Sequence, residues 1–295
     1  MAAEESILLN LSQSWSMPLS LVSPNFADLI EPNIEVGKFP DGDAHVRILD
    51  LEKYRGQEVT LYHRLYPKQN TSLVVLLLIL DTLKEIGAKV SVVIPYLPYA
   101  RQDKTKLNGE VGSAKVICNL LARAGCQKLY TFDCHFLNSE GDHKFGELNI
   151  HNISMAKALA EKAKEFFNEP FEIVVPDVGA EYLVKDMGGK HFNKVRKEYD
   201  GNKIGYRDVE SLTCDFDIKD KNFLVLDDMI STGSTMITAI QKLKECGAKK
   251  VACGTIHGLF LFNCLYKLHK LTDHVFSTDT IPTAQSSVSI KDKLP

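Results

Sequence analysis

The chain has 295 residues, which suits either two domains of about 150 residues each or one large domain. Its 44% hydrophobic and 25% charged content is that of an ordinary folded protein, and its formal net charge of −3 argues against a broad basic surface for nucleic acid. The longest apolar run, Leu73 to Leu80, is far shorter than the roughly 20 residues of a membrane-spanning helix, so we expect neither a nucleic-acid nor a membrane partner.

The first residues and the cysteines both indicate a cytoplasmic location. Met1 to Glu5 is acidic, and no basic segment precedes an apolar core there, as a secretory signal would require. The seven cysteines form no Cys-x-x-Cys pair, so we expect reduced thiols without a metal or a disulfide framework.

The N-terminal part contains one clear pattern, between Lys38 and Ile48. Residues 1–33 have poor periodicity, and we assign no motif to them. Asp41-Gly42-Asp43 is typical of a tight turn, and the alternating residues after it are typical of a strand. On local grounds this segment is a plain β-hairpin.

Repeated helix-to-strand connections indicate the class of fold. Residues 70–87 have cap residues at the start, a wide apolar face and a final glycine, which predicts a helix, and a strand follows at 89–94. The connection Lys-Glu-Ile-Gly-Ala-Lys at 84–89 recurs as Lys-Glu-Cys-Gly-Ala-Lys at 244–249, and in a weaker form at 122–128. Each is a helix that ends at a glycine and leads into a strand.

Units of this kind predict an α/β fold with two similar, doubly wound domains and mainly parallel sheets. We divide the chain into residues 1–152 and 153–295, and we expect a helix from Ser154 to Phe167 to open the second domain. A solenoid is not expected, because no short period persists along the chain.

A polar loop follows the strand at 89–94. Pro95 and Pro98 interrupt the chain, and Arg101, Gln102 and Lys104 then gather near the expected carboxyl end of that strand. These side chains could bind a polyphosphate, with the guanidinium as a bidentate donor, or they could form a solvated surface loop. The local residues leave both interpretations open.

A helix at 113–124 and a strand at 128–132 lead to Asp133-Cys134-His135. A histidine beside a carboxylate at a strand end suits a metal or phosphate site, although a single histidine is more often only hydrogen-bonded. The polar residues 138–150 that follow predict a loop.

The second half begins with a strand at 171–176 and a turn at Asp177-Val178-Gly179-Ala180. Four cations follow between Lys190 and Lys197, and such a run usually marks a solvated surface. On an extended segment Lys194 and Arg196 would share one face and Lys197 would point to the other. Near the end of the chain we expect a strand at 251–257, a helix at 260–271 and a last strand at 275–282.

The most informative stretch is Asn222 to Thr238. Phe223 to Leu226 predicts a short buried parallel strand, which the acidic pair Asp227 and Asp228 ends. Ser-Thr-Gly-Ser-Thr at 231–235 then precedes a helical spacing of apolar residues, so N–H groups and hydroxyls would gather at a helix N-terminus that favours a phosphate.

Acidic side chains beside a phosphate suit a phosphorylated sugar, whose hydroxyls they can bind, or a cation. A Walker-type nucleotide loop is disfavoured, because the lysine after its last glycine is absent. The other interpretation is a solvated acidic turn followed by an ordinary helix cap.

In order along residues 36–290, these motifs resemble those of the ribose-phosphate diphosphokinase family. The acidic pair with its Ser-Thr-Gly-Ser-Thr turn resembles the phosphoribosyl-diphosphate motif, which phosphoribosyltransferases share. Pro-Tyr-Ala-Arg-Gln-Asp-Lys at 98–104 resembles a loop that transferases consuming phosphoribosyl diphosphate lack. The spacing of this loop is closest to archaeal-type members, and the chain reaches Pro295 about where the family's closing helix would begin.

The resemblance implies the type I phosphoribosyltransferase fold and a transfer of the diphosphoryl group from ATP to the C1 hydroxyl of ribose 5-phosphate. The products would be AMP and 5-phosphoribosyl 1-diphosphate, a precursor for nucleotide biosynthesis. It also implies Mg²⁺ as cofactor and a homo-oligomer, a dimer or larger, in which the hairpin at 38–48 reaches the ATP base in a neighbouring subunit.

The family's motifs assign roles to single positions of this chain, with Pro40 and Asp43 replacing the family's serine and glutamate in the hairpin. The Lys-x-Arg pair, Lys194 and Arg196, would close over the transferring group and is assigned to catalysis. Lys197 is a rival for the role of the lysine. ATP binding falls to Phe39, Asp41, Asp43, Arg101 and Gln102. Mg²⁺ falls to His135 and Asp177. Ribose 5-phosphate falls to Arg196, Asp227, Asp228, Ser231, Thr232, Gly233, Ser234 and Thr235.

Two other classes of function stay open from the sequence. A catalytically inert homologue that regulates a true synthase would keep the fold, and the residues after Arg196 depart from the family pattern in a way that fits it. A phosphoribosyltransferase or a regulator that senses sugar phosphates would share only the motif at 223–238.

Overall fold

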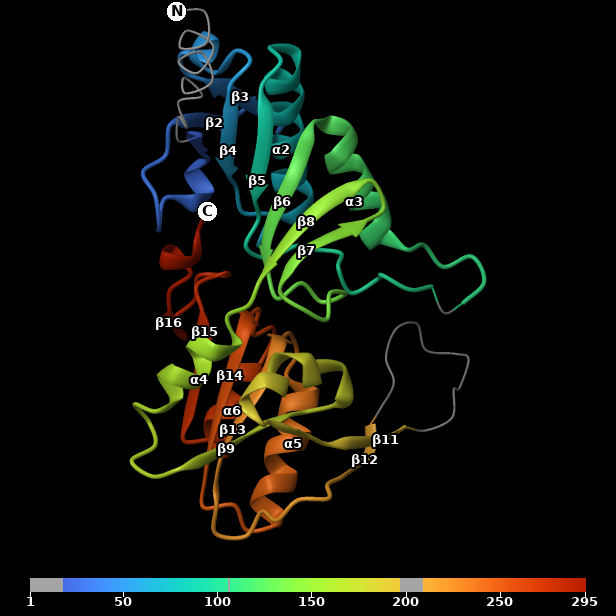
Figure 1. Ribbon diagram of the computed structural model, residues 1–295, viewed down its shortest axis with the longest axis vertical. Helices are drawn as coiled ribbons and strands as arrows, with labels where there is room; N and C mark the ends of the chain where they lie inside the picture. The colour runs from blue at the N-terminus through green and yellow to red at the C-terminus, as the bar shows by residue number, and fades with distance from the viewer. Residues whose placement is uncertain (1–17, 106, 197–208) are drawn as a thin grey trace, which may run out of the picture.

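The computed structural model describes residues 18–105, 107–196 and 209–295. Within these ranges the chain forms two α/β domains, each with a six-stranded sheet, which follow one another along the long axis of the molecule (Figure 1). The predicted fold class is confirmed. Among the helices of these ranges, none combines the length and apolar character needed to cross a membrane.

The first sheet has the strand order β1-β4-β5-β6-β8-β7, and only the pairing of β7 with β8 is antiparallel. Helices α2 (Gln69–Glu85) and α3 (Ser113–Ala124) pack against it, around a core that includes the fully buried Leu61, Leu76 and Leu80. The strands are β1 (Leu19–Val22), β4 (Glu58–Tyr62), β5 (Lys89–Val93), β6 (Cys126–Phe132), β7 (Gly141–Phe145) and β8 (Leu148–Ile153).

The second sheet has the order β10-β9-β13-β14-β15-β16, and all its pairings are parallel. Its strands are β9 (Phe171–Val175), β10 (Lys190–His191), β13 (Asn222–Ile230), β14 (Lys250–Gly258), β15 (His274–Thr278) and β16 (Ser286–Val288). Helices α4 (Ala156–Ala163), α5 (Ser234–Glu245) and α6 (Cys264–Leu271) cover it.

The apolar run in β13 is continuous because both faces of this sheet are buried. Successive side chains of a strand point to opposite faces. Leu224 and Leu226 accordingly join the core beneath α4, whereas Phe223 and Val225 join the core beneath α5 and α6. The strand β13 therefore contributes side chains to the cores on both faces of the second sheet.

Two antiparallel hairpins stand apart from the sheets. The first pairs β2 (Ile34–Lys38) with β3 (Ala44–Ile48), and β3 packs on α2. The second pairs β11 (Asn193–Arg196) with β12 (Val209–Thr213). Short 3-10 helices complete the described elements: η1 (Pro24–Phe26), η2 (Leu51–Tyr54), η3 (Val178–Leu183), η4 (Lys185–Met187) and η5 (Lys291–Lys293).

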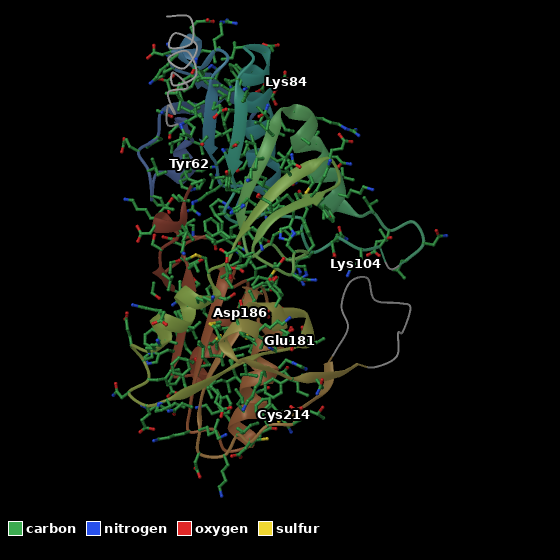
Figure 2. The ribbon with its side chains drawn as sticks, viewed as in Figure 1. Tyr62, Lys84, Lys104, Glu181, Asp186 and Cys214 are labelled. Carbon is green, nitrogen blue, oxygen red and sulfur yellow. The ribbon has the colours of Figure 1, made fainter. Side chains whose placement is uncertain are left out.

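The two domains meet at several places. Tyr96 of the first domain packs with Met229 and Ile281 of the second in a small buried cluster. The C-terminal residues also return to the first domain, where the Tyr62 hydroxyl donates a hydrogen bond to the carbonyl oxygen of Pro295 at 2.8 Å (Figure 2 labels Tyr62). The division of the chain at residues 152 and 153 stays a prediction.

The prediction of a loop at 138–150 is wrong, because β7 and the first half of β8 lie there. The polar composition has a physical reason, since β7 is the outer strand of the sheet and Asp142 binds Lys128 at 2.8 Å and His151 at 2.7 Å. The inward side chains Leu148 and Ile150 are buried and attach the hairpin to the core.

Three further boundaries differ from the prediction. The strand before the acidic pair does not end there, because β13 continues to Ile230. The helix expected at 260–271 begins only at Cys264, since Phe260 and Phe262 adopt positive φ angles of 45° and 57°. The helix expected from Ser154 to Phe167 is the shorter α4.

The predicted glycine stops allow a test of the fold. Gly87 and Gly125 both have positive φ, but a Cβ on Gly87 would meet nothing within 4 Å, whereas one on Gly125 would lie 3.2 Å from the Cβ of Lys84. Gly87→Ala should lower the free energy of unfolding by about 1 kcal/mol through backbone strain. Gly125→Ala should cost about 1 kcal/mol more, because crowding adds to that strain. Urea denaturation measures both, and equal losses would contradict the crowding at Gly125.

Candidate active site

The acidic pair lies inside β13, close to its carboxyl end. The Oδ1 atom of Asp227 accepts the N–H of Asp228 at 3.0 Å, and the Oδ1 atom of Asp228 accepts the N–H of Met229 at 2.8 Å. The side chain of Asp228 is 10% exposed. Since a carboxylate in such a position needs a compensating partner, the question is what stands opposite it.

The partner is His135, which comes from the first domain. It follows the end of β6, and its Nδ1 lies 2.6 Å from the Oδ2 atom of Asp228. The hydrogen bond to Asp228 raises the pKa of His135 above its ordinary value, although burial acts in the opposite direction. A charge-assisted hydrogen bond therefore joins the end of a strand in the first sheet to a strand of the second sheet.

The two carboxyl groups of the pair are driven to different charge states. Burial raises the pKa of Asp227, and the neighbouring charges of Asp228 and Asp177 raise it further. Burial also opposes ionisation of Asp228, but the hydrogen bond and charge of His135 outweigh it, so the pKa of Asp228 is lowered. His135 thus selects Asp228 as the residue of the pair that stays ionised.

Asp177 lies near this pair at the start of η3. Its Oδ1 atom accepts the N–H of Gly179 at 2.8 Å, so the side chain caps the short helix, as the predicted turn requires. Its charge contributes to the raised pKa of Asp227, which places it on the same side of the molecule as the acidic pair. The two residues expected to hold a metal, His135 and Asp177, therefore flank Asp227 and Asp228.

Residues 231–233 connect β13 to α5, and Ser234 and Thr235 form the first turn of that helix. Gly233 adopts a φ of 76° immediately before the helix, a conformation that few other residues adopt. A Cβ there would lie only 2.3 Å from the Sγ atom of Cys264, which is buried. The N-terminus of α5 opens at this point, where unpaired N–H groups and the helix dipole favour an anion.

The loop after β5 projects from the side of the first domain, where Figure 2 labels Lys104. Arg101 is exposed, and its charge acts on the pKa of His135, which indicates that the guanidinium stands near the histidine. Gln102 is held by Ser113, whose hydroxyl donates to its Oε1 atom at 2.8 Å. Arg101 therefore lies near His135, and the side chain of Gln102 is held by the first residue of α3.

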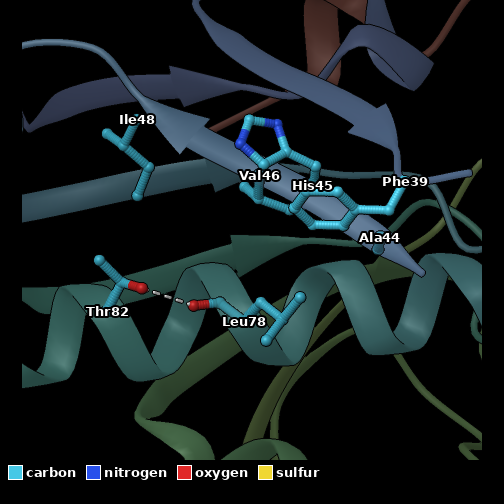
Figure 3. A pocket seen from close by; sticks show the side chains of 7 residues that line it. All are labelled: Phe39, Ala44, His45, Val46, Ile48, Leu78 and Thr82. Atoms are coloured by element: carbon cyan, nitrogen blue, oxygen red, sulfur yellow. Dashed lines mark hydrogen bonds between the residues drawn. The ribbon is translucent and has the colours of Figure 1, made fainter.

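The three hairpin residues expected to bind ATP lie elsewhere. Phe39 is 51% exposed and packs edge-on against His45 with ring centres 5.2 Å apart, while Asp41 accepts the N–H of Asp43 at 3.1 Å. Phe39 lines a cavity of 280 Å³ between β3 and α2 (Figure 3). In Figure 1 this hairpin is at the far end of the first domain from β13, so one chain alone does not bring these residues to the acidic pair.

The Lys-x-Arg pair lies in β11, where the structure describes its backbone. Lys194 pairs with Leu212 and Arg196 with Val209, and the register shifts between Val195 and Arg196. The extended conformation that the prediction assumed is thus present. Lys197, the rival for the lysine role, lies outside the described residues.

Two further residues near the site have buried polar atoms, and of the two only Asp133 belongs to a motif noted in the sequence. The hydroxyl of Tyr182, on η3, is buried without a hydrogen-bond partner, and burial together with the charge of Asp228 raises its pKa. Asp133 is 1% exposed and accepts the N–H of Met155 at 2.7 Å, and burial raises its pKa to about 7. A tyrosine in a short helical turn looks like any other until the neighbouring strands are placed.

Comparison with known proteins identifies relatives that match both domains of the chain. Residues 27–125 match the model of the N-terminal domain of ribose phosphate pyrophosphokinase, and residues 149–289 match that of the phosphoribosyl transferase domain. A ribose-phosphate pyrophosphokinase of Pyrococcus abyssi is 36% identical and covers 88% of each chain. One of Sulfurisphaera tokodaii is 33% identical over 97% of this chain and 93% of its own.

A solved structure agrees on the fold. The phosphoribosylpyrophosphate synthetase of Mycobacterium smegmatis superposes with a TM-score of 0.77 at 24% identity, over 94% of this chain and 96% of its own. The expected likeness to archaeal members is confirmed, since archaeal sequences are among the relatives matched.

The contact between the domains predicts a measurable titration in the metal-free protein. The pKa of His135 should lie above 6.5 and should fall in Asp228→Asn, because an amide cannot provide the negative charge that stabilises the imidazolium. The contact therefore contributes stability that is complete below the unfolded-state pKa and is lost as the pH rises through the raised pKa of His135. A titration followed by NMR of the ring nitrogens measures it.

Asp142→Asn provides the control, because Asp142 contacts His151 on the outer hairpin. It should leave the titration of His135 unchanged. A pKa of His135 that is the same in Asp228→Asn and in the unmodified protein would contradict the contact.

Proposed function

The chain belongs to the ribose-phosphate pyrophosphokinase family, and from this premise we propose the reaction and the roles of its residues. The reaction is the transfer of the diphosphoryl group of ATP to the C1 hydroxyl of ribose 5-phosphate. The C1 oxygen forms a bond to the β-phosphorus, the bond from this phosphorus to the oxygen it shares with the α-phosphorus breaks, and AMP leaves with that oxygen. The hydroxyl proton passes to solvent.

One observation supports this proposal most directly. The contact of His135 with Asp228 brings the end of β6 in the first domain against the strand whose end carries the phosphate loop. A sugar-phosphate half and a nucleotide half of a site are then adjacent in one chain. Such a transfer needs mainly positioning and charge neutralisation, which this arrangement can supply.

Ribose 5-phosphate fits the second domain. The 5-phosphate would bind to the loop of Ser231, Thr232, Gly233, Ser234 and Thr235 at the N-terminus of α5, where only a glycine suits the φ of 76°. Asp227 and Asp228 would accept hydrogen bonds from the ribose hydroxyls. The different pKa directions of the two carboxyls leave one ionised acceptor for those hydroxyls.

The diphosphoryl group would lie between the domains. Arg101 is exposed and electrostatically close to His135, so it can neutralise a phosphate of ATP as a bidentate donor, with Gln102 beside it. Lys194 and Arg196 on β11 would close over the transferring group and offset its developing charge.

Mg²⁺ fits the residues present. His135 and Asp177 offer one imidazole nitrogen and one carboxylate, a set that suits an ion which binds through one or two protein ligands and completes its shell with phosphate oxygens and water. His135 gives Nδ1 to Asp228, as metal-binding histidines usually do with a carboxylate, so Nε2 and the carboxylate of Asp177 would hold the ion. When bound, Mg²⁺ would neutralise phosphate charge and orient the diphosphate.

The ATP base would be bound across a subunit boundary. The β2–β3 hairpin that carries Phe39, Asp41 and Asp43 is at the far end of the first domain from β13, so these residues would serve the site of a neighbouring copy. We therefore infer a homo-oligomer, a dimer or larger, working on small metabolites in the cytoplasm.

A single assay tests the proposed reaction. The purified protein should release AMP when it is given ATP, ribose 5-phosphate and Mg²⁺ together, and should not do so without ribose 5-phosphate. Formation of 5-phosphoribosyl 1-diphosphate in equal amount completes the test. Absence of AMP release under these conditions would overturn the proposal.

The sugar-binding role of Asp227 predicts a selective effect. Asp227→Asn should raise the KM for ribose 5-phosphate by roughly 5- to 150-fold, since loss of one partner in a buried polar contact costs about 1–3 kcal/mol. The KM for ATP should change far less. Asp217→Asn, at a carboxylate that is 72% exposed in the same domain, is the control and should alter neither constant. Equal rises in both KM values for Asp227→Asn would rule out sugar binding.

The Lys-x-Arg pair predicts a loss of turnover instead. Lys194→Ala should lower the turnover number by at least about 100-fold, a size usual for one oriented donor that acts in the transition state. ATP affinity should stay nearly unchanged, because the charge would be recruited as the loop closes. Lys197→Ala is the matched control and should do much less. A large loss of turnover in Lys197→Ala together with normal turnover in Lys194→Ala would show that the assigned register is wrong.

A further inference from the structure

His257 is a buried histidine at the junction of the two domains. It lies near the end of β14 and pairs in register with Met229, the residue after the acidic pair. Only 1% of its surface is exposed, and the Tyr96 ring of the first domain packs against it at 4.9 Å. None of the motifs singled out in the sequence includes it.

Both ring nitrogens of His257 are hydrogen-bonded, and the partners fix the position of its proton. Nε2 lies 3.0 Å from the carbonyl oxygen of Phe132, which can only accept, so Nε2 carries the hydrogen. Nδ1 lies 3.0 Å from the hydroxyl of Thr280. Burial lowers the pKa of His257 to about 4, so the ring is neutral and Nδ1 accepts from that hydroxyl.

The surrounding hydroxyls agree with this assignment. If Thr280 donates to His257, the carbonyl oxygen of Ile256 still needs a donor. Thr278 supplies it, with its hydroxyl 2.7 Å from that oxygen. The main-chain carbonyl of Thr280 accepts from Nη1 of Arg64, in the first domain, at 2.5 Å. Every group of this network therefore has a partner, and two of its bonds cross from one domain to the other.

The residue that His257 holds lies just before the site. Phe132 is the last residue of β6, and His135 follows three positions later. The bond from His257 thus fixes the carboxyl end of β6 against β14, while the neighbouring strand β13 carries Asp228. The 2.6 Å contact of His135 with Asp228 depends on the relative placement of these two strand ends.

We propose that His257 is a positioning residue for the diphosphoryl transfer, because its imidazole sets the distance between His135 and Asp228 by fixing β6 to the second domain. This inference rests on the proposed function for its kinetic effect. It does not require His257 to touch a substrate. A misplacement of about 1 Å at reacting groups can cost about 100-fold in rate, so a small displacement of His135 would be measurable.

A purely structural role would have the same burial, and the chain contains a matched control. His63 is also 1% exposed, its Nε2 lies 2.9 Å from the carbonyl oxygen of Ser72, and its Nδ1 lies 2.8 Å from the hydroxyl of Ser23. Burial lowers its pKa to about 4 as well. Both of its bonds stay within the first domain, so its loss removes equal bonding without freeing β6 from β14.

The experiment compares His257→Leu with His63→Leu in the full-length protein. His257→Leu should lower the turnover number by about 10- to 100-fold, with the KM for ribose 5-phosphate within about 2-fold of the unmodified value because the phosphate loop lies wholly in the second domain. His63→Leu should lower the melting temperature similarly and keep the turnover number within about 2-fold. His257→Gln, whose amide can still donate to Phe132, should restore most of the rate.

Thr280→Val provides a milder variant if His257→Leu does not fold, since it removes only the hydroxyl that donates to Nδ1. It should reduce turnover in the same direction. Crystal structures supply a readout that does not depend on activity: the separation of His135 Nδ1 from Asp228 Oδ2 should exceed 2.6 Å in His257→Leu and stay at 2.6 Å in His63→Leu.

An unchanged separation in His257→Leu, or equal losses of turnover in His257→Leu and His63→Leu, would overturn the positioning role. If His257→Leu does not fold, full turnover in Thr280→Val would do the same. A failure of the proposed function looks different, because the unmodified protein would then release no AMP while the crystallographic distances still decide the role of His257.

Discussion

The structure depends on one contact, the hydrogen bond between His135 and Asp228. The two residues are 93 positions apart and belong to different domains, yet they lie 2.6 Å from each other. Without a cationic partner, two adjacent carboxyls in a mostly buried strand would repel one another, and both would tend to be neutral. The histidine keeps Asp228 ionised and so gives the second domain a fixed charge that faces the first.

The sheets are built to present this contact. Parallel strands gather their carboxyl ends at one edge, and each domain contributes one such edge, with β6 from the first sheet and β13 from the second. The apolar alternation of β13 attaches its acidic end to two cores at once, so the carboxylates stand on a rigid support. The loop with Arg101 and the hairpin with Lys194 lie outside the two six-stranded sheets.

Local chemistry determined what the sequence could predict. The strand at Phe223, the turn at Gly233 and the glycine stop at Gly125 each follow from a few neighbouring residues, and the structure has them. The contact of His135 with Asp228 could not be predicted, because it depends on how two sheets are placed against each other. His257 and Tyr182 were missed for the same reason, since one histidine in a strand or one tyrosine in a turn has no local signature.

The outer hairpin was missed for the opposite reason, since its polar residues look like those of a loop. Those polar residues also affect how separate copies of the protein interact. An outer strand leaves a row of unpaired backbone groups to which another chain can add by extending the sheet. The charged side chains Asp142 and Lys144 on β7 make that addition unfavourable, so the composition that disguises the strand also protects concentrated protein from aggregation through this edge.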